Sequence, residues 1–383
     1  MKILVVHQHY VVGRYQNTLA EIVRNNNAEI HFLVPPSFKM GIEIQAVNMY
    51  PREIIMHVLP APFSAKGKQH LFFFIGLSKL IRRLKPDVVW SQAPNSVNTY
   101  QVTRICRRLK IPTVLLRFSN YKRDYWKMHH PLDPRRYLFH FLRRWNYAYA
   151  SATYVIDDLV ESVVLWEGFN KKIFKGMTMG ISDEFFNMGR KRLTEGKFDT
   201  LRVVFVGRFT PAKGLKILID AFDAAAQNNE MTLTIAGSGD YEREVREHVA
   251  AKKNSERIVI SGFVPYEKMP QYLSEFDVCV LCSEAKGKAL EQFGRVLVEA
   301  QAAGCIVIGS DVGGIPNAIR TGGFVIPEGS VAHLEDKLRY LAGCDNQTFN
   351  SLRHAGFLSA LENFSDPVLG QEIFKNLSSI NYR

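Results

Sequence analysis

The sequence lacks the features of a membrane-spanning or exported protein. None of its apolar runs approaches the roughly 20 residues that a helix needs to cross a bilayer. Its first ten residues, MKILVVHQHY, resemble a buried strand and lack the charged, apolar and cleavage regions of a signal peptide. We therefore expect a cytoplasmic protein.

Cysteine is also scarce, with five scattered residues in a chain of 383. Cys279 and Cys282 form a C-x-x-C, but a metal or redox site would need a second ligand pair or an exposed helix start. The pair lies within FDVCVLCS, which is typical of a buried strand. We expect both cysteines to be structural, and we predict no metal site.

Acidic residues are few in the first half of the chain. Residues 1–190 contain 27 Lys and Arg against 13 Asp and Glu, whereas the remainder contains 22 against 24. This asymmetry indicates an anionic partner, either nucleic acid or acidic lipid, with a solvated basic face as the alternative. Segment 66–85 fits membrane contact and core packing equally well. Segment 121–145, in which aromatics alternate with Lys and Arg, favours an anionic membrane or a lipid-linked acceptor.

The length fits two domains, and 46% hydrophobic with 22% charged residues is typical of a globular protein. Apolar runs alternate with helical patterns, which predicts βαβ units with parallel sheets. In the first half we expect strands at residues 2–6, 29–34, 54–58, 88–91, 113–117 and 153–156, and helices at 16–25, 67–84, 97–109, 138–149 and 157–167. The polar segment 187–200 predicts a linker between domains 1–190 and 200–365.

Segment 291–314, EQFGRVLVEAQAAGCIVIGSDVGG, is the most informative part of the chain. Glu291 stands before Phe293-Gly294, and Glu299 lies about two turns into the following helix. Two carboxylates on one face can accept sugar hydroxyls, while the helix N-terminus favours phosphate. An amphipathic helix with a capping acid is the simpler alternative.

EQFGRVLVEA followed by GSDVGGIP resembles glycosyltransferase family 4, the retaining GT-B enzymes, and a branch that makes bacterial surface polysaccharides. The resemblance implies an α/β fold of GT-B type, with two Rossmann-like α/β domains facing an interdomain cleft. It also implies that a terminal helix, about 366–383, crosses back onto the first domain. The expected reaction moves a sugar from a nucleoside-diphosphate sugar to a hydroxyl of a glycan or lipid-linked acceptor, without metal or cofactor.

The resemblance also assigns roles to residues. Arg208 and Lys213, cations around a strand-to-helix loop, match the diphosphate ligands, and with Glu291 they are the expected catalytic residues. Glu291 matches the acid that meets the donor sugar, and Glu299 the acid that binds the ribose. The remaining expected donor-site residues are Gly13, Gly207, Gly237, Val264, Phe293 and Gly294.

The sequence departs from the family pattern at several points. Glu242 occupies the third glycine position of a dinucleotide fingerprint, which makes NAD binding a weak hypothesis. Asn317 replaces an acid that often follows the Gly-Gly-Ile-Pro turn. No His or Asp follows the strand that ends at Arg117, where many relatives carry one. A sugar-nucleotide epimerase of the same fold and a basic nucleic-acid-binding protein remain alternatives, although no nucleic-acid module is recognised.

Overall fold

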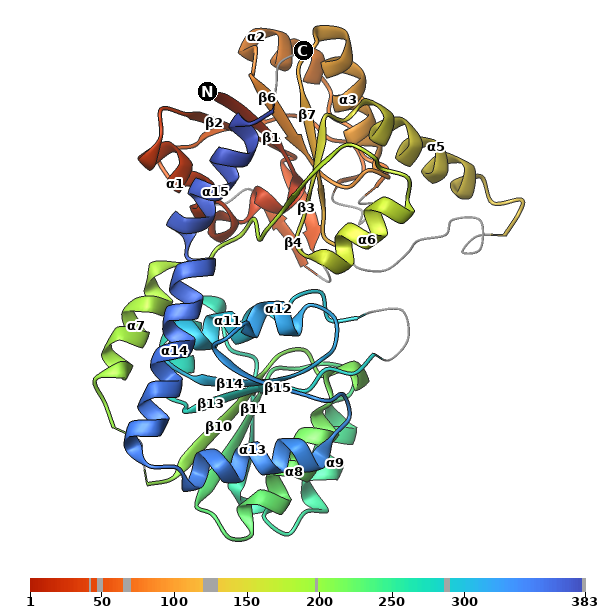
Figure 1. Ribbon diagram of the computed structural model, residues 1–383. Coiled ribbons are helices and arrows are strands. Elements are labelled where there is room, and N and C mark those ends of the chain that lie inside the picture. Colours follow the sequence, from red (N-terminus) through yellow and green to blue (C-terminus); the bar gives the residue numbers. More distant parts are fainter. Residues whose placement is uncertain are drawn as a thin grey trace. The chain divides into compact units, whose positions relative to one another are not determined.

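The computed structural model describes residues 1–40, 43–46, 51–64, 70–119, 130–196, 199–285 and 290–380. The chain forms two compact units, the first made of Met1–Gly180 with Asp366–Arg383 and the second of Ile181–Ser365 (Figure 1). Each unit is built around a parallel sheet with helices packed against it. Among the described residues, no helix combines the length and apolar character that a membrane crossing requires.

The first unit contains a seven-stranded parallel sheet in the order β5-β2-β1-β6-β7-β8-β9. Its strands are β1 (Lys2–Val6), β2 (Glu29–Val34), β5 (Ile55–Val58), β6 (Val88–Ser91), β7 (Thr113–Arg117), β8 (Ala152–Val155) and β9 (Lys172–Lys175). The α-helices of this unit are α1 (Asn17–Asn25), α2 (Leu77–Leu84), α3 (Val97–Leu109), α5 (Pro134–Tyr149), α6 (Asp158–Trp166) and α15 (Asp366–Ser378). Short 3-10 turns, η1 (Gln8–Val11) and η2 (Gly13–Tyr15), follow β1, and β3 (Ser37–Met40) and β4 (Glu43–Ala46) form a separate antiparallel hairpin.

Helix α15 packs on α1 of the first unit (Figure 1). The hydroxyl of Thr18 on α1 donates to Asp366 Oδ1 at 2.5 Å, and Gly180 N donates to the Thr18 hydroxyl at 2.6 Å. Ile373 and Leu377 of α15 are buried in the same core as the strands of this unit. The last helix therefore completes the core of the first unit.

The outer strands β2 and β5 carry a chain of polar contacts. His31 Nε2 lies 2.7 Å from Glu29 Oε1, and His31 Nδ1 lies 2.8 Å from His57 Nε2. Because the carboxylate can only accept, His31 donates from Nε2 to Glu29. Burial and the nearby charges of His31 and Arg83 lower the pKa of His57.

The second unit contains a six-stranded parallel sheet in the order β12-β11-β10-β13-β14-β15. Its strands are β10 (Leu201–Val206), β11 (Met231–Ala236), β12 (Ile258–Gly262), β13 (Val278–Leu281), β14 (Ile306–Ser310) and β15 (Gly323–Ile326). Its α-helices are α7 (Asp183–Leu193), α8 (Leu215–Ala226), α9 (Glu242–Ala250), α10 (Met269–Ser274), α11 (Arg295–Ala302), α12 (Ile315–Ile319), α13 (Val331–Gly343) and α14 (Asn346–Phe364). Short 3-10 turns are η4 (Pro211–Lys213), η5 (Ser255–Arg257) and η6 (Tyr266–Lys268).

The linker prediction for residues 187–200 is wrong for its first part. Residues 187–193 lie in α7, and the chain passes between the units at Gly180–Ile181. Phe185 and Phe186 of α7 are fully buried. Arg192 at the end of α7 forms an ion pair with buried Asp277, which also lies 3.1 Å from Arg202 Nε and 3.5 Å from Arg353 Nη2. This cluster fixes α7 to the second unit.

The helix predicted for residues 67–84 is also shorter than expected. Residues 67–69 lie outside the described part of the chain, and α2 begins only at Leu77, after Gly76 with a φ of 87°. Before it, Phe72 and Phe74 are buried while Phe73 and Ile75 are exposed, which is the alternation of an extended chain. The Gln101 side chain holds this segment by bonding both Phe74 N and Phe74 O.

Candidate functional site

The polar residues predicted for the donor site in the second unit gather where its parallel strands end. Strands β10 and β13 are neighbours, although β11 and β12 lie between them in the sequence. The strand order reverses at this pair, and ligands of open α/β sheets bind outside the carboxyl ends of strands at such a switch point. The loop after β10 carries Arg208 and Lys213, and the loop after β13 carries Glu291.

Lys213 and Glu291 form an ion pair that joins these two loops. Lys213 ends the turn η4, and the next residue, Gly214, has a φ of 64° and starts α8. A Cβ atom on Gly214 would lie 1.8 Å from the carbonyl oxygen of Cys282, so only glycine allows the β10 loop to approach β13 this closely. Glu291 is also held by the Ser283 hydroxyl, which donates to Oε2 at 3.2 Å.

The Gly313-Gly314 turn supports the backbone of the Glu291 loop. Gly314 N donates to Glu291 O at 3.0 Å. A Cβ atom on Gly313 would lie 2.0 Å from the same oxygen, and one on Gly314 would lie 2.2 Å from the oxygen of Gln292. The spacing between EQFG and GG in the sequence thus reflects direct packing of two loops.

Gly294 and Phe293 shape the entrance to α11. Gly294 caps α11 with a φ of 82°, so the first backbone N–H groups of the helix lack intrahelical acceptors and can receive an anion. Phe293 is buried, and its ring contacts that of Phe364 edge to face at 5.5 Å. The aromatic side chain therefore anchors the loop in the core.

Glu299 lies on α11 in a nearly closed environment. Its Oε1 accepts from Arg295 Nε at 2.8 Å and from the Tyr266 hydroxyl at 3.1 Å. Burial and the neighbouring carboxylate raise the pKa of Tyr266, which keeps its hydroxyl protonated as a donor. The sequence reasoning missed both partners. Only the i, i+4 spacing of Arg295 and Glu299 could have indicated one of them.

The loops after β10 and β11 approach each other through glycine. Gly237 has a φ of 140°, and a Cβ atom there would lie 1.9 Å from the Gly207 oxygen. Arg208 is exposed, and no carboxylate in the described part of the chain forms an ion pair with it. Val264, after β12, is half-buried, next to Phe263 with its side chain largely in solvent.

The predicted residues of the first half lie in the first unit. Gly13 begins η2 after β1, and the site described above is built from the second unit alone. Arg117, at the end of β7, donates to Glu167 Oε1 at 2.8 Å, while Tyr147 donates to Glu167 Oε2 at 2.6 Å. Arg117, the last residue of β7, is thus held in a buried structural ion pair.

No group of His, Cys, Asp and Glu that could hold a metal ion occurs among the residues that the structure describes. Cys279 and Cys282 are buried free thiols, and burial raises the pKa of Cys282 to about 12, which suits a packing role. Chemically, the second-unit site offers two cations, two carboxylates and a helix N-terminus, a set that fits a diphosphate with hydroxyl-rich groups on either side.

Comparisons with known proteins agree with this chemistry. Residues 192–354 match the sequence profile of a family described as glycosyl transferases group 1. The amylovoran biosynthesis glycosyltransferase AmsK of Erwinia amylovora is 33% identical over 160 residues, which are 41% of this chain and 39% of AmsK. The chain therefore matches well under half the length of this curated relative.

Solved structures resemble the whole chain at low identity. HepE of Anabaena, solved with UDP and glucose, superimposes with a TM-score of 0.65 at 19% identity, covering 99% of this chain and 100% of HepE. A glycosyltransferase from Rickettsia africae gives a TM-score of 0.69 at 15% identity, covering 99% of this chain and 98% of its own. The predicted GT-B fold is confirmed, and residues 192–354, less than half of the chain, match the group 1 glycosyltransferases.

Proposed function

We propose that this protein is a retaining glycosyltransferase. It moves a sugar from a nucleoside-diphosphate sugar to a hydroxyl of a glycan or lipid-linked acceptor, in the synthesis of a cell-surface polysaccharide. The observation that carries the proposal is the Lys213–Glu291 pair at the switch point, with Glu299 on the adjoining helix, inside the segment that matches the family. AmsK is named for amylovoran biosynthesis, and HepE holds UDP and glucose, which supports the setting and the donor class.

The ion pair indicates how the donor is received. A diphosphate attracts the Lys213 ammonium, and a sugar hydroxyl then takes the place of the ammonium on Glu291. Both charged groups therefore keep a partner before and after binding. Arg208 supplies a second cation to the diphosphate, the N–H groups after Gly294 face its oxygens, and Glu299 accepts the ribose hydroxyls.

In the reaction the bond between the anomeric carbon and the phosphate oxygen breaks, and the acceptor oxygen bonds to the same face of that carbon. The acceptor proton passes to the departing phosphate, and the electron pair of the broken bond stays on the diphosphate. Arg208 and Lys213 stabilise the charge that develops there, which removes the need for a metal ion. This step also requires no protein base, in keeping with the sequence Phe-Ser-Asn, without His or Asp, directly after Arg117.

The first unit binds the acceptor, and the protein acts in the cytoplasm at the inner face of the cell membrane. The charge excess of residues 1–190 supports this placement, because a basic surface is attracted to an acidic leaflet. No nucleic-acid partner is part of the proposal.

Donor binding and turnover can be tested one after the other. A thermal-shift screen against nucleoside-diphosphate sugars should raise the melting temperature with one or a few donors, because a ligand of the native state stabilises it. Transfer from that donor should give a product with the donor's anomeric configuration by NMR, with full activity in excess chelator. Inverted configuration would refute the retaining mechanism, and dependence on an added divalent ion would refute the metal-free step.

A sugar-nucleotide epimerase is the second candidate, because it shares the fold and the donor site. It would convert the donor to an isomer without any acceptor. Incubation of the stabilising donor alone, followed by NMR, separates the two: an epimeric sugar nucleotide would favour the epimerase.

A further inference from the structure

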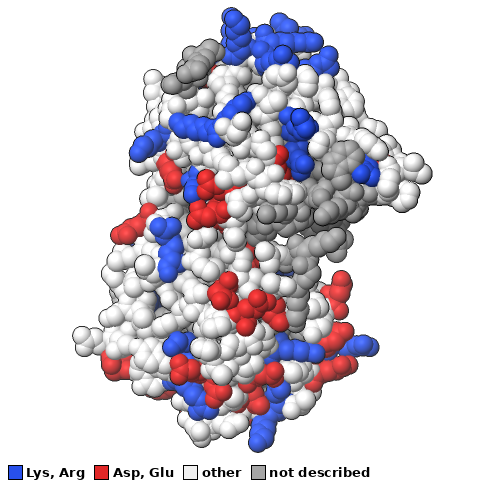
Figure 2. Space-filling view, turned by 45° about the vertical axis from the view of Figure 1, so that its right-hand side comes forward, with Lys and Arg blue, Asp and Glu red and all other residues white. Residues whose placement is uncertain are grey.

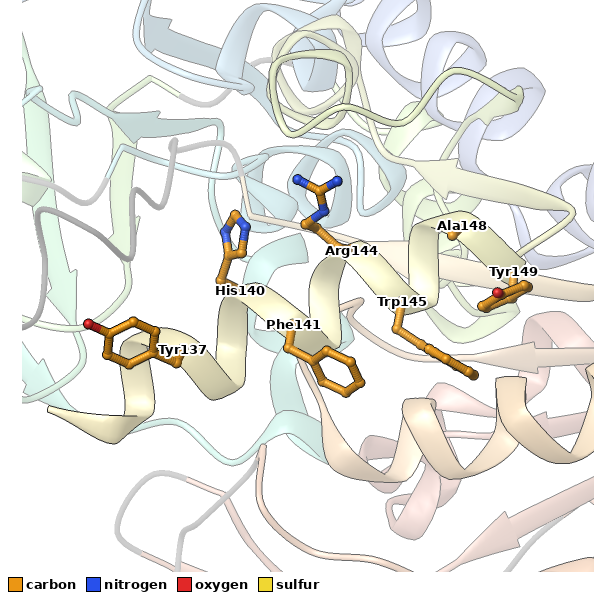
Figure 3. A pocket seen from close by; sticks show the side chains of 7 residues that line it. All are labelled: Tyr137, His140, Phe141, Arg144, Trp145, Ala148 and Tyr149. Carbon is orange, nitrogen blue, oxygen red and sulfur yellow. The ribbon is translucent and has the colours of Figure 1, made fainter.

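Helix α5 carries an aromatic stripe on its exposed side. Four aromatic side chains follow one another at intervals of four residues: Tyr137, Phe141, Trp145 and Tyr149. Each step advances about 6 Å along the helix axis. Figure 3 shows Phe141 and Trp145 on one side of the helix and His140 and Arg144 on the other. These side chains line an open hollow of about 390 Å³.

Helix α3 extends this stripe. The ring of Tyr100 lies 5.8 Å from that of Phe141 and 5.3 Å from that of Trp145. The Arg107 guanidinium lies 3.9 Å from the centre of the Tyr149 ring, a cation–π contact. Tyr100, Arg107 and the four aromatic residues of α5 are called the α3–α5 face below.

The α3–α5 face is cationic and has no carboxylate of its own, because neither helix contains Asp or Glu. Exposed arginines flank the rings: Arg104, Arg107 and Arg108 on α3 and Arg144 on α5. Apolar side chains also reach solvent: Phe141 of this face is 49% exposed, and Leu132, in the turn before α5, is 84% exposed. Figure 2 likewise shows Lys and Arg without Asp or Glu at the end of this unit where α2 lies.

Two arginines of the basic segment 121–145 do not belong to this surface. Arg143 is buried, and its Nη1 lies 3.5 Å from Glu167 Oε1. Arg135 forks onto Asp133 with its Nε and Nη2, at distances from 2.6 to 3.0 Å. Arg143 is buried and Arg135 is paired, so the cations available to a partner come from α3 as well as α5.

We propose that the α3–α5 face docks the protein on an anionic bilayer. Aromatic rings seat at the level of the lipid headgroups, exposed Leu and Phe enter the boundary below them, and the arginines meet acidic headgroups. Single-stranded nucleic acids are instead held in a positively charged groove with stacking platforms. Next to the α3–α5 face, the exposed aliphatic side chain of Leu132 cannot stack on a base but can enter a bilayer. The inference rests on the proposed function in one respect: docking would bring the enzyme to a lipid-linked acceptor.

The test is sedimentation of the full-length protein with vesicles of phosphatidylcholine alone or mixed with phosphatidylglycerol. Binding should require phosphatidylglycerol and weaken with salt. The double variant Arg104→Gln/Arg144→Gln should bind about 25-fold more weakly, since each basic residue near an acidic leaflet contributes about fivefold. Phe141→Ser should weaken vesicle binding about three- to tenfold, because only the exposed half of the ring is available to be buried in the bilayer. Phe141→Trp should retain binding.

A matched charge change, Arg243→Gln/Arg246→Gln on exposed helix α9 of the second unit, should leave vesicle binding unchanged. Wild-type binding by the Arg104/Arg144 variant, equal binding to both lipid compositions, or binding to oligo-dT without binding to vesicles would overturn the proposal. The donor thermal shift, measured on the same protein, keeps the two proposals apart. Vesicle binding without a thermal shift by any sugar nucleotide would refute the proposed transferase function alone. A thermal shift without vesicle binding would refute the docking face alone.

Discussion

Replacement of Glu299 by alanine provides the sharpest test of the donor site. The carboxylate is buried and accepts two hydrogen bonds, from Arg295 Nε at 2.8 Å and the Tyr266 hydroxyl at 3.1 Å. The substitution removes the carboxylate that faces Arg295, but the Arg295 side chain keeps its contact with the Tyr266 hydroxyl at 3.4 Å, is 28% exposed and can recruit water. The expected cost to folding is therefore about 1–2 kcal/mol.

The cost to nucleotide binding should be larger than this and separable from it. Hydrogen bonds to a charged group contribute about 1.5–3 kcal/mol, so the donor Kd should rise about 10- to 150-fold. Calorimetry with the nucleoside diphosphate that gives the largest thermal shift measures this change. Wild-type affinity in folded Glu299→Ala would refute the ribose role.

Glu335→Ala is a matched control for this experiment. Arg339 Nε on α13 donates to Glu335 Oε1 at 2.8 Å, which is the i, i+4 spacing of Arg295 and Glu299 with the two charges in the opposite order along the helix. Removing this carboxylate should have a similar or smaller effect on folding. Nucleotide affinity should stay at the wild-type value, because no predicted donor-site residue lies on α13.

Three further predictions concern turnover, stability and pH. Arg208→Ala and Lys213→Ala should each lower kcat by about 100-fold or more under saturating donor, because their contacts strengthen as charge develops on the diphosphate; unchanged kcat would contradict the assignment. Asp277→Ala leaves buried guanidinium groups without their carboxylate and should lower the free energy of unfolding of the second unit by about 3–5 kcal/mol in urea titrations; a loss below about 1 kcal/mol would show that the cluster contributes little. Burial and the neighbouring His31 lower the pKa of His57, so the unfolded chain binds its proton first, and stability should fall as pH drops below about 6.5 and level off below the lowered pKa. His57→Gln should flatten this part of the melting-temperature profile, and an unchanged slope would exclude His57 as its source.

The sequence predicted the sheets well because buried parallel strands are short, continuous apolar runs. It also located the candidate donor residues, since polar and glycine residues that directly follow such strands share one edge of the sheet. Their assigned roles stay predictions. From the sequence, only the family pattern connects Gly313-Gly314 with Glu291. The structure supplies the physical reason: a Cβ atom on Gly313 would lie 2.0 Å from the Glu291 carbonyl oxygen, so the two loops can pack only with glycine there.

Features that depend on distant parts of the chain were not predictable. Tyr266 meets Glu299 through the packing of a loop 33 residues away. Arg143 occurs in a basic aromatic segment yet is buried against Glu167, 24 residues later. Residues 187–193 of α7 are polar and charged and so match the pattern of a linker, whereas the two phenylalanines that anchor the helix precede them. In each case a tertiary contact outweighs the local pattern.

The attachment of α15 to the first unit has a consequence for synthesis of the protein. A ribosome completes every residue of the second unit before it makes Asp366 and the helix that follows. Translation at 5–20 residues per second leaves roughly 10–40 s in which residues 1–180 wait without Ile373 and Leu377 in their core. Although most of the first unit is synthesised first, it therefore cannot complete its core until this last helix has been made.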